Sequence, residues 1–136
     1  MDFVLKDLGR KLGRRAFKRL TIPGAVVSWM LKGQESFPDT QWPLSDISRA
    51  GLSFLTNEPP AIGSEVSLRV FLPQSNETLE LHGSVVYSIP RGPRLTYRYR
   101  VGVESKAFAQ LEAENSPQLL KIIEASERKY GKQKKN

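Results

Sequence analysis

The chain has 136 residues, a formal net charge of +7, one histidine and no cysteine. This length predicts one domain with a single hydrophobic core. The absence of cysteine excludes a disulfide scaffold, a thiolate metal site and a cysteine nucleophile, and a single histidine disfavours a histidine-rich metal site. No run of eighteen apolar residues occurs and the first residues lack the apolar core of a signal peptide, so we expect a cytoplasmic protein without a transmembrane segment.

The positive charge is concentrated at the two ends of the chain. Residues 1–20 carry a net charge of +5 and residues 128–136 another +5, whereas residues 21–127 carry a net charge of −3. A uniformly basic nucleic-acid-binding face is therefore disfavoured. Anionic small molecules, membrane surfaces and acidic proteins remain candidate partners, and residues 132–136 are expected to form a solvated basic tail.

Residues 2–12 have leucines at helical spacing, which favours a short amphipathic helix ahead of a basic segment. Gly9 and Gly13 argue against a longer helix. We therefore expect residues 1–13 to form a flexible or short helical N-terminal segment that precedes a folded domain over residues 14–115.

Six short segments with strand-like patterns follow, with no helix between them. They cover residues 25–31, 44–47, 52–55, 65–72, 79–89 and 95–103. Alternation is clearest over 65–72, and over 79–89 it places Tyr87 on the same face as Leu81. Closely spaced strands of this kind predict an antiparallel barrel or sandwich.

One helix is predicted after the strands, over residues 116–131. Ser116 suits the N-cap, Pro117 suits the first helical position, and Gly131 suits the C-terminal end. The apolar stripe of this helix is expected to cover the strands or one open end of a barrel.

Nothing in the sequence favours an enzyme. The phosphate-binding loop and the nucleophile elbow are both absent. Asp39 and Asp46 have no obvious basic partner for the activation of a nucleophile. His82 alternates with apolar neighbours in a strand pattern, which predicts an exposed strand residue rather than a general base. No catalytic residue, metal site or cofactor is therefore predicted.

Three arginines, Arg14, Arg15 and Arg19, lie within six residues just ahead of the first predicted strand. The planar guanidinium donates two parallel hydrogen bonds to phosphate, and it also pairs with the guanine edge or stacks on a purine. Such a segment suits a guanine nucleotide. The alternative is a solvated basic segment, or one that contacts acidic lipid headgroups.

A second candidate feature is the run from Asp46 to Gly51, between two predicted strands. Asp46 can accept hydrogen bonds from N1 and N2 of guanine, and Ser48 can bond to a base or a phosphate. Gly51 permits a positive φ or a close backbone approach. The alternative is an ordinary turn in which the side chains bond to their own backbone.

Together these runs resemble the signature of the PilZ domain family, R-x-x-x-R followed by [D/N]-x-S-x-x-G. Here the signature residues are Arg15, Arg19, Asp46, Ser48 and Gly51. Residues 83–87 resemble the family's G-x-V-V strand and residues 100–103 its closing strand, so the resemblance covers residues 14–108. It implies a six-stranded antiparallel β-barrel with a C-terminal helix and a receptor for the bacterial second messenger cyclic di-GMP.

The resemblance also implies site residues. Arg15 and Arg19 would hold phosphates and guanine faces, and an arginine at position 14 accompanies binding of an intercalated ligand dimer. Asp46 and Ser48 would contact the guanine edge. The predicted ligand-binding residues are Arg14, Arg15, Arg19, Asp46, Ser48, Gly51, Tyr87 and Gly102, and Tyr87 stands where many relatives have tryptophan.

Signalling is expected to proceed through ordering of the N-terminal segment and an unidentified protein effector in motility, pilus or polysaccharide machinery, with a monomer or homodimer as the working unit. Two alternatives remain. One is a PilZ-like adaptor without a ligand. The other is a barrel that binds single-stranded nucleic acid, because tyrosines and arginines interleave over residues 94–100. A strand with core-facing tyrosines and solvent-facing arginines, Arg98 and Arg100, explains that pattern equally well.

Overall fold

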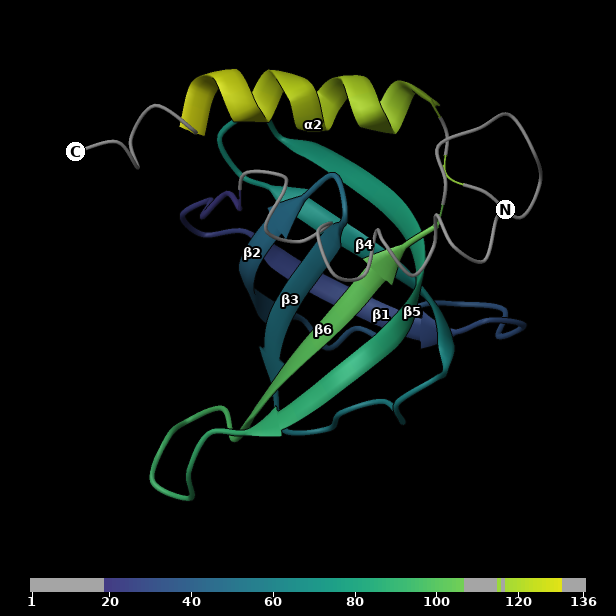
Figure 1. Cartoon of the computed structure of the whole chain (residues 1–136), viewed down its shortest axis with the longest axis vertical. Coiled ribbons are helices and arrows are strands. Elements are labelled where there is room, and N and C mark those ends of the chain that lie inside the picture. Colours follow the sequence, from purple (N-terminus) through teal and green to yellow (C-terminus); the bar gives the residue numbers. More distant parts are fainter. Residues whose placement is uncertain (1–18, 107–114, 116, 131–136) are drawn as a thin grey trace, which may run out of the picture.

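The computed structural model describes residues 19–106, 115 and 117–130. A closed antiparallel barrel carries a helix across one end (Figure 1). Its elements are β1 (Val26–Leu31), β2 (Trp42–Ser48), β3 (Gly51–Thr56), β4 (Glu65–Leu72), β5 (Glu77–Pro90), β6 (Tyr99–Ser105) and α2 (Pro117–Tyr130). The strand order around the barrel is β1-β2-β3-β6-β5-β4. The predicted six-stranded antiparallel barrel with a C-terminal helix is therefore confirmed.

The alternating apolar residues that the sequence shows in the strands form the core of the barrel. In β4, Val66, Leu68, Val70 and Leu72 are at most 5% exposed, whereas Arg69 between them faces solvent. In β3 both faces are largely buried: Leu52 and Phe54 belong to the core, and Ser53 between them is also buried. A strand with one buried face and one solvated face needs this pattern, so the prediction for 65–72 was right to the residue.

The prediction for Tyr87 was wrong because β5 contains a bulge. Val85 pairs with Val103, but the next pair along the ladder is Tyr87 with Gly102, so β5 has one residue more than β6 at this point. An extra residue reverses which face the following side chains point to. Tyr87 therefore leaves the face of Leu81, which lines the core, and lies on the outer face of the barrel.

The last strand starts later than predicted, at Tyr99 rather than at residue 95. The side chain of Asn57 accepts a hydrogen bond from the Arg98 amide and donates one to the Thr96 carbonyl, at 2.9 and 3.0 Å. These backbone groups are therefore used in a loop rather than in a strand ladder. The tyrosine–arginine alternation over 94–100 is thus mostly loop, which weakens the nucleic-acid alternative.

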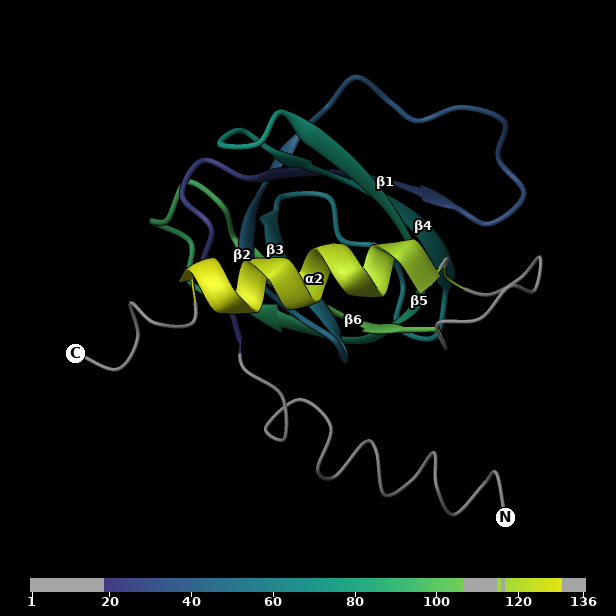
Figure 2. The same cartoon turned by 90° about the horizontal axis from the view of Figure 1, so that it is seen from above.

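Helix α2 lies across the end of the barrel at which β2 turns into β3 (Figure 2). Ile123 is 2% exposed and belongs to the barrel core. Arg49, in the turn between β2 and β3, donates two hydrogen bonds to Glu127 at 2.8 and 2.9 Å. The hydrogen bond to Glu127 raises the pKa of Arg49 further above its usual range. The predicted cap residues Ser116 and Gly131 lie outside the described residues.

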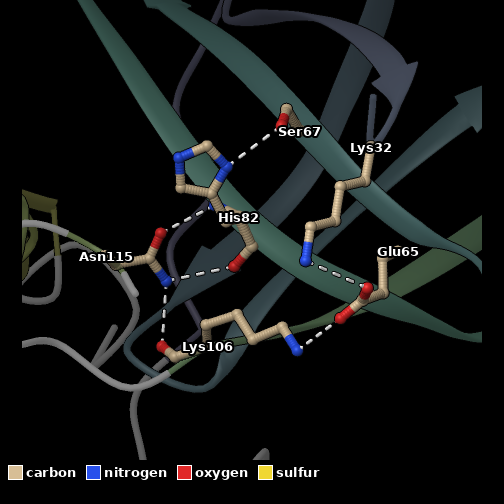
Figure 3. A network of polar contacts seen from close by, with 6 residues as sticks. All are labelled: Lys32, Glu65, Ser67, His82, Lys106 and Asn115. Atoms are coloured by element: carbon tan, nitrogen blue, oxygen red, sulfur yellow. Dashed lines mark hydrogen bonds and ion pairs between the residues drawn. The ribbon is translucent and has the colours of Figure 1, made fainter. Parts of the chain in front are cut away.

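A polar network ties strand ends together at another corner of the barrel (Figure 3). Asn115 donates to the carbonyls of His82 and Lys106 and accepts from the His82 amide. Nδ1 of His82 is hydrogen-bonded to the Ser67 hydroxyl at 3.0 Å, and His82 is half-buried. The prediction of an exposed His82 was wrong, because its ring is hydrogen-bonded to Ser67 and Asn115 lies against its backbone.

Candidate functional site

Two predicted motifs, 27 positions apart in the sequence from Arg19 to Asp46, meet at the edge of β2. The Leu20 amide donates to the Ile47 carbonyl at 2.8 Å, and the Ile47 amide donates to the Leu20 carbonyl at 3.0 Å. Both side chains are buried, at 0% and 2% exposure, so the residues on either side of them point outward. Arg19 is exposed there, beside the outward-facing Asp46 and Ser48.

Asp46 is held by two donors and is only 8% exposed. The Ser53 hydroxyl donates to Oδ1 at 2.8 Å, and Nη2 of Arg100 donates to Oδ2 at 3.1 Å. Arg100 reaches across β3, since β2 and β6 flank that strand. Each carboxylate oxygen retains a second acceptor position, so both remain able to accept hydrogen bonds from a ligand.

Arg100 lies in a strand and faces outward, as the solvent-facing reading expects, but it also forms an ion pair with Asp46, which the sequence prediction did not include. Arg100 and Ser53 are residues of this face that the sequence prediction missed. The available signal was periodicity: Ser53 stands between buried Leu52 and Phe54, and Arg100 precedes buried Val101, so both must point outward. Nε of Arg100 is itself buried and has no hydrogen-bond partner among the described residues.

The turn that carries Ser48 and Gly51 is braced from several directions. The Ser48 hydroxyl accepts a hydrogen bond from the Ala50 amide at 3.1 Å. Ser105 of β6 donates to the carbonyls of Arg49 and Ala50, both at 2.9 Å. Gly51 has a φ of +148°, and a Cβ there would lie 1.9 Å from the Val103 carbonyl oxygen. The residues from Ser48 to Gly51 therefore form a turn that is held by the Ser48 side chain, as one interpretation of the sequence predicted. Position 51 of this turn requires glycine.

Tyr87 joins the same outer face through Gly102. The register pairs Tyr87 with Gly102, Gly102 with Ser53, and Ser53 with Asp46, which forms one row across four strands. A Cβ at Gly102 would lie 2.0 Å from Cε2 of Tyr87, so the tyrosine ring lies directly on the glycine. The missing side chain thus places a flat aromatic ring on the face that carries the Asp46–Arg100 pair.

Six of the eight predicted ligand-binding residues are described, and they gather on the outer face of β2, β3, β6 and β5 together with the chain just before Leu20. Arg14 and Arg15 lie outside the described residues. The face offers a carboxylate, guanidinium groups, a hydroxyl and an aromatic ring. This set suits a ligand that combines negative charge with planar rings that donate hydrogen bonds.

The described residues show neither a metal cluster nor a membrane-crossing helix. No group of three or more histidine, cysteine, aspartate or glutamate side chains among them could hold a metal ion. No helix in the described part of the chain is long and apolar enough to span a bilayer.

Comparisons with known proteins agree with this architecture. A search of curated protein sequences found no match. Among solved structures, the chain is similar to the PilZ domain with c-di-GMP of YcgR from Escherichia coli, with a TM-score of 0.61 and 18% identity over 85% of this chain and 93% of that one. The sequence profile of the PilZ domain matches residues 13–124. With most of its length covered by that profile, the chain belongs to the PilZ domain family.

Proposed function

We propose that this protein is a receptor for cyclic di-GMP, which it binds on the outer face of β2, β3 and β6. The observation that carries the proposal is the backbone bridge between Leu20 and Ile47, which brings Arg19, the last arginine of the run, beside Asp46 and Ser48. Membership of the PilZ family supports it, as does the similarity of fold to the PilZ domain with c-di-GMP of YcgR.

Each proposed contact follows from the chemistry of the side chain. Arg15 and Arg19 bind the phosphates and the guanine faces, because a guanidinium group suits both. Arg14, directly ahead of them, favours an intercalated ligand dimer. Asp46 accepts from N1 and N2 of guanine, and the ion pair with Arg100 orients that carboxylate for the purpose.

Ser48, Gly51, Tyr87 and Gly102 complete the proposed site. Ser48 and Gly51 hold the turn that positions Asp46, since the Ser48 hydroxyl accepts from the Ala50 amide and Gly51 allows the turn to approach the backbone of β6. Tyr87 offers a stacking surface that is smaller than the tryptophan common in the family, so its contribution to affinity is correspondingly weaker. Gly102 is what allows that ring to lie flat on the sheet.

We further propose that the ligand signals through the N-terminal segment. Seven basic side chains on residues 1–20 repel one another, and the two phosphates of the ligand neutralise part of that charge. Binding then orders the segment over the barrel face and changes the surface available to a protein effector. This mechanism requires no catalytic step.

Isothermal titration calorimetry with cyclic di-GMP tests the binding proposal. Substituting Arg15→Ala or Arg19→Ala should weaken binding about tenfold or more, because a charged hydrogen bond contributes roughly 1.5–3 kcal/mol. Arg94→Ala removes the same charge from an exposed loop and serves as the matched control. Circular dichroism verifies that each variant folds.

Unchanged affinity in both motif variants would contradict the proposal. A mobility shift with a single-stranded oligonucleotide, measured beside the calorimetry, distinguishes the nucleic-acid alternative. Folded wild-type protein that binds neither cyclic di-GMP nor the oligonucleotide would favour an adaptor without a ligand.

A further inference from the structure

A second concave surface lies away from the proposed ligand site, between the β1–β2 loop and the chain after β3. This aromatic groove has a volume of about 690 Å³ and is lined by apolar and acidic side chains. Its main lining residues are Trp29, Phe37, Pro38, Trp42, Glu35 and Glu58. The loop over residues 32–41 arches outside the barrel (Figure 2). None of these residues belongs to the proposed cyclic di-GMP site.

Both ends of the loop that walls the groove are fixed to the barrel. At its start, the side chain of Gln34 accepts a hydrogen bond from the Leu31 amide at 2.9 Å, and the Lys32 amide donates to the Glu65 carbonyl at 3.0 Å. At its end, the Ser28 hydroxyl donates to the Thr40 carbonyl at 2.9 Å. The groove is therefore formed without a partner, which lowers the entropic cost of binding one.

The aromatic side chains that line the groove also pack against neighbouring side chains. Tyr97 packs edge-on against Trp42, with ring centroids 6.2 Å apart and planes at 84°. The guanidinium of Arg69 lies 4.2 Å from the centroid of the Phe37 ring. Trp29 and Trp42 are the only tryptophans of the chain, and both are half-buried on this surface. Half-buried tryptophans in a concave site are typical of residues that contribute strongly to binding.

The charge of the groove is opposite to that of the whole protein. Glu35 and Glu58 are its charged lining residues, both are exposed, and neither has an ion-pair partner among the described residues. The chain as a whole carries +7. Indole rings present a negative face that attracts cations, and the two carboxylates add to this field. The groove therefore repels phosphate backbones and anionic lipid and attracts cationic groups.

We propose that the aromatic groove docks an extended basic segment of a partner protein, with an arginine or lysine side chain seated between the indole rings and the two carboxylates. Its volume lies within the range of about 300–1,000 Å³ that is usual for sites taking a few side chains or a small ligand. Cation–π contact and charge complementarity supply the selectivity for that chemistry. The docking surface is independent of cyclic di-GMP.

Tryptophan fluorescence tests this directly, because both indoles line the groove. We would titrate the full chain with a nine-residue peptide in which arginines alternate with alanines, and with the same peptide carrying citrulline in place of arginine. Citrulline keeps the size of the side chain and removes its charge. The arginine peptide should give a saturable change in emission that weakens as salt is added, and the citrulline peptide should give none.

Variants of the two acidic lining residues, Glu35 and Glu58, test the contribution of charge to peptide binding. Glu35→Gln with Glu58→Gln should weaken binding of the arginine peptide about tenfold. Glu77→Gln with Glu124→Gln removes the same charge from β5 and α2, away from the groove, and should leave the affinity unchanged. Equal binding of both peptides, or equal affinity in both double variants, would overturn the proposal. A dimer of this chain would also overturn it. Such a dimer would be seen by sedimentation, and removal of residues 131–136 would dissociate it and expose the tryptophans. The occupant of the groove would then be a second copy of this chain.

Discussion

The ring of Tyr87 lies on Gly102, and a Cβ at position 102 would stand 2.0 Å from Cε2 of that ring. This contact connects a bulge in β5 to the outer face of β6. The bulge turns Tyr87 outward, and the glycine leaves the space in which the ring rests. An aromatic ring over a strand glycine also covers backbone that would otherwise be exposed.

We predict that Gly102→Ala displaces the tyrosine without unfolding the barrel. The atoms that a methyl group would meet belong to the Tyr87 side chain, which can rotate away, so the cost in stability should be about 1 kcal/mol. Loss of the ring from this face should weaken cyclic di-GMP binding. Nuclear Overhauser contacts between the Tyr87 ring and residue 102 provide the measurement.

The double variant Gly102→Ala with Tyr87→Ala is the control for the steric argument. Compared with Tyr87→Ala alone it should lose little further stability, because no ring is left for the methyl group to meet, while the affinity stays low because the ring is absent. A Gly102→Ala protein that keeps the wild-type ring contacts would contradict the prediction, since it would show that a methyl group fits beneath the ring.

Gly51 presents the opposite case, because here the obstacle is backbone. A Cβ at Gly51 would lie 1.9 Å from the Val103 carbonyl oxygen, and its φ of +148° is itself strained for any other residue. We predict that Gly51→Ala lowers the free energy of unfolding by about 3 kcal/mol or more, measured by urea denaturation. The turn between β2 and β3 would have to separate from β6.

Gly33 gives a matched control for that prediction. Its φ of +96° is also positive, but nothing lies within 4 Å of a Cβ built there. Gly33→Ala should therefore cost only about 1 kcal/mol, the strain of the backbone alone. Equal losses in the two variants would mean that conformational strain, and not the contact with Val103, makes glycine necessary at position 51.

Local patterns were enough to predict the barrel, but not every side-chain direction. The alternation over 65–72 arises because this strand has one buried face. This pattern, and the short spacing of the strands, can be recognised within each segment of the sequence. The bulge between Val85 and Tyr87 has no local signal, since Val86 is as apolar as its neighbours. The direction of Tyr87 depends on pairing with a strand about fifteen positions further on.

In the candidate site too, some residues could be predicted from the local sequence and others could not. The arginine run and the residues Asp46, Ser48 and Gly51 are visible as short motifs, and the resemblance to a family linked them. The pairing of Asp46 with Arg100 joins positions 54 apart and depends on β6 lying beside β3. Strand order is a property of the whole fold, so local reading treated Arg100 as a solvated residue.

This pairing leads to a further prediction. Arg100→Ala leaves a carboxylate, 11% exposed in its side chain, with only the Ser53 hydroxyl as a donor. Because Arg100 is itself 38% exposed, we expect a moderate loss of about 1–2 kcal/mol in stability rather than the larger cost of breaking a fully buried pair. Urea denaturation measures this, and calorimetry should show weaker cyclic di-GMP binding.

Arg98→Ala is the comparison for Arg100→Ala. Arg98 is exposed in the loop before β6, and its hydrogen bond to Asn57 uses the backbone amide, which the substitution keeps. Stability and ligand affinity should therefore remain near the wild-type values. If the two variants behave alike, the Asp46–Arg100 pair does not organise the site.

The last prediction concerns acid and the network at Glu65 (Figure 3). Nζ of Lys106 donates to Oε1 of Glu65 at 2.7 Å, and Nζ of Lys32 lies 3.4 Å from Oε2. The hydrogen bond from Lys106 and the charges of both lysines lower the pKa of Glu65 below its usual value of 4.5. A lowered pKa in the folded state means that the ionised carboxylate favours folding.

The contribution of Glu65 is therefore fully present above about pH 4.5, the ordinary value, and is lost as the pH falls through the lowered pKa of the folded protein. The urea midpoint of Glu65→Gln should lie below that of the wild type at pH 7, and the difference should shrink as the pH falls below 4.5 and in 1 M salt. The side chain is 43% exposed, so the difference should be small. Glu77→Gln, at an exposed position on β5, should show no such dependence on pH. A difference that does not change with pH would assign the effect to packing of the side chain, since the attraction to the two lysines must weaken as the carboxylate takes up a proton.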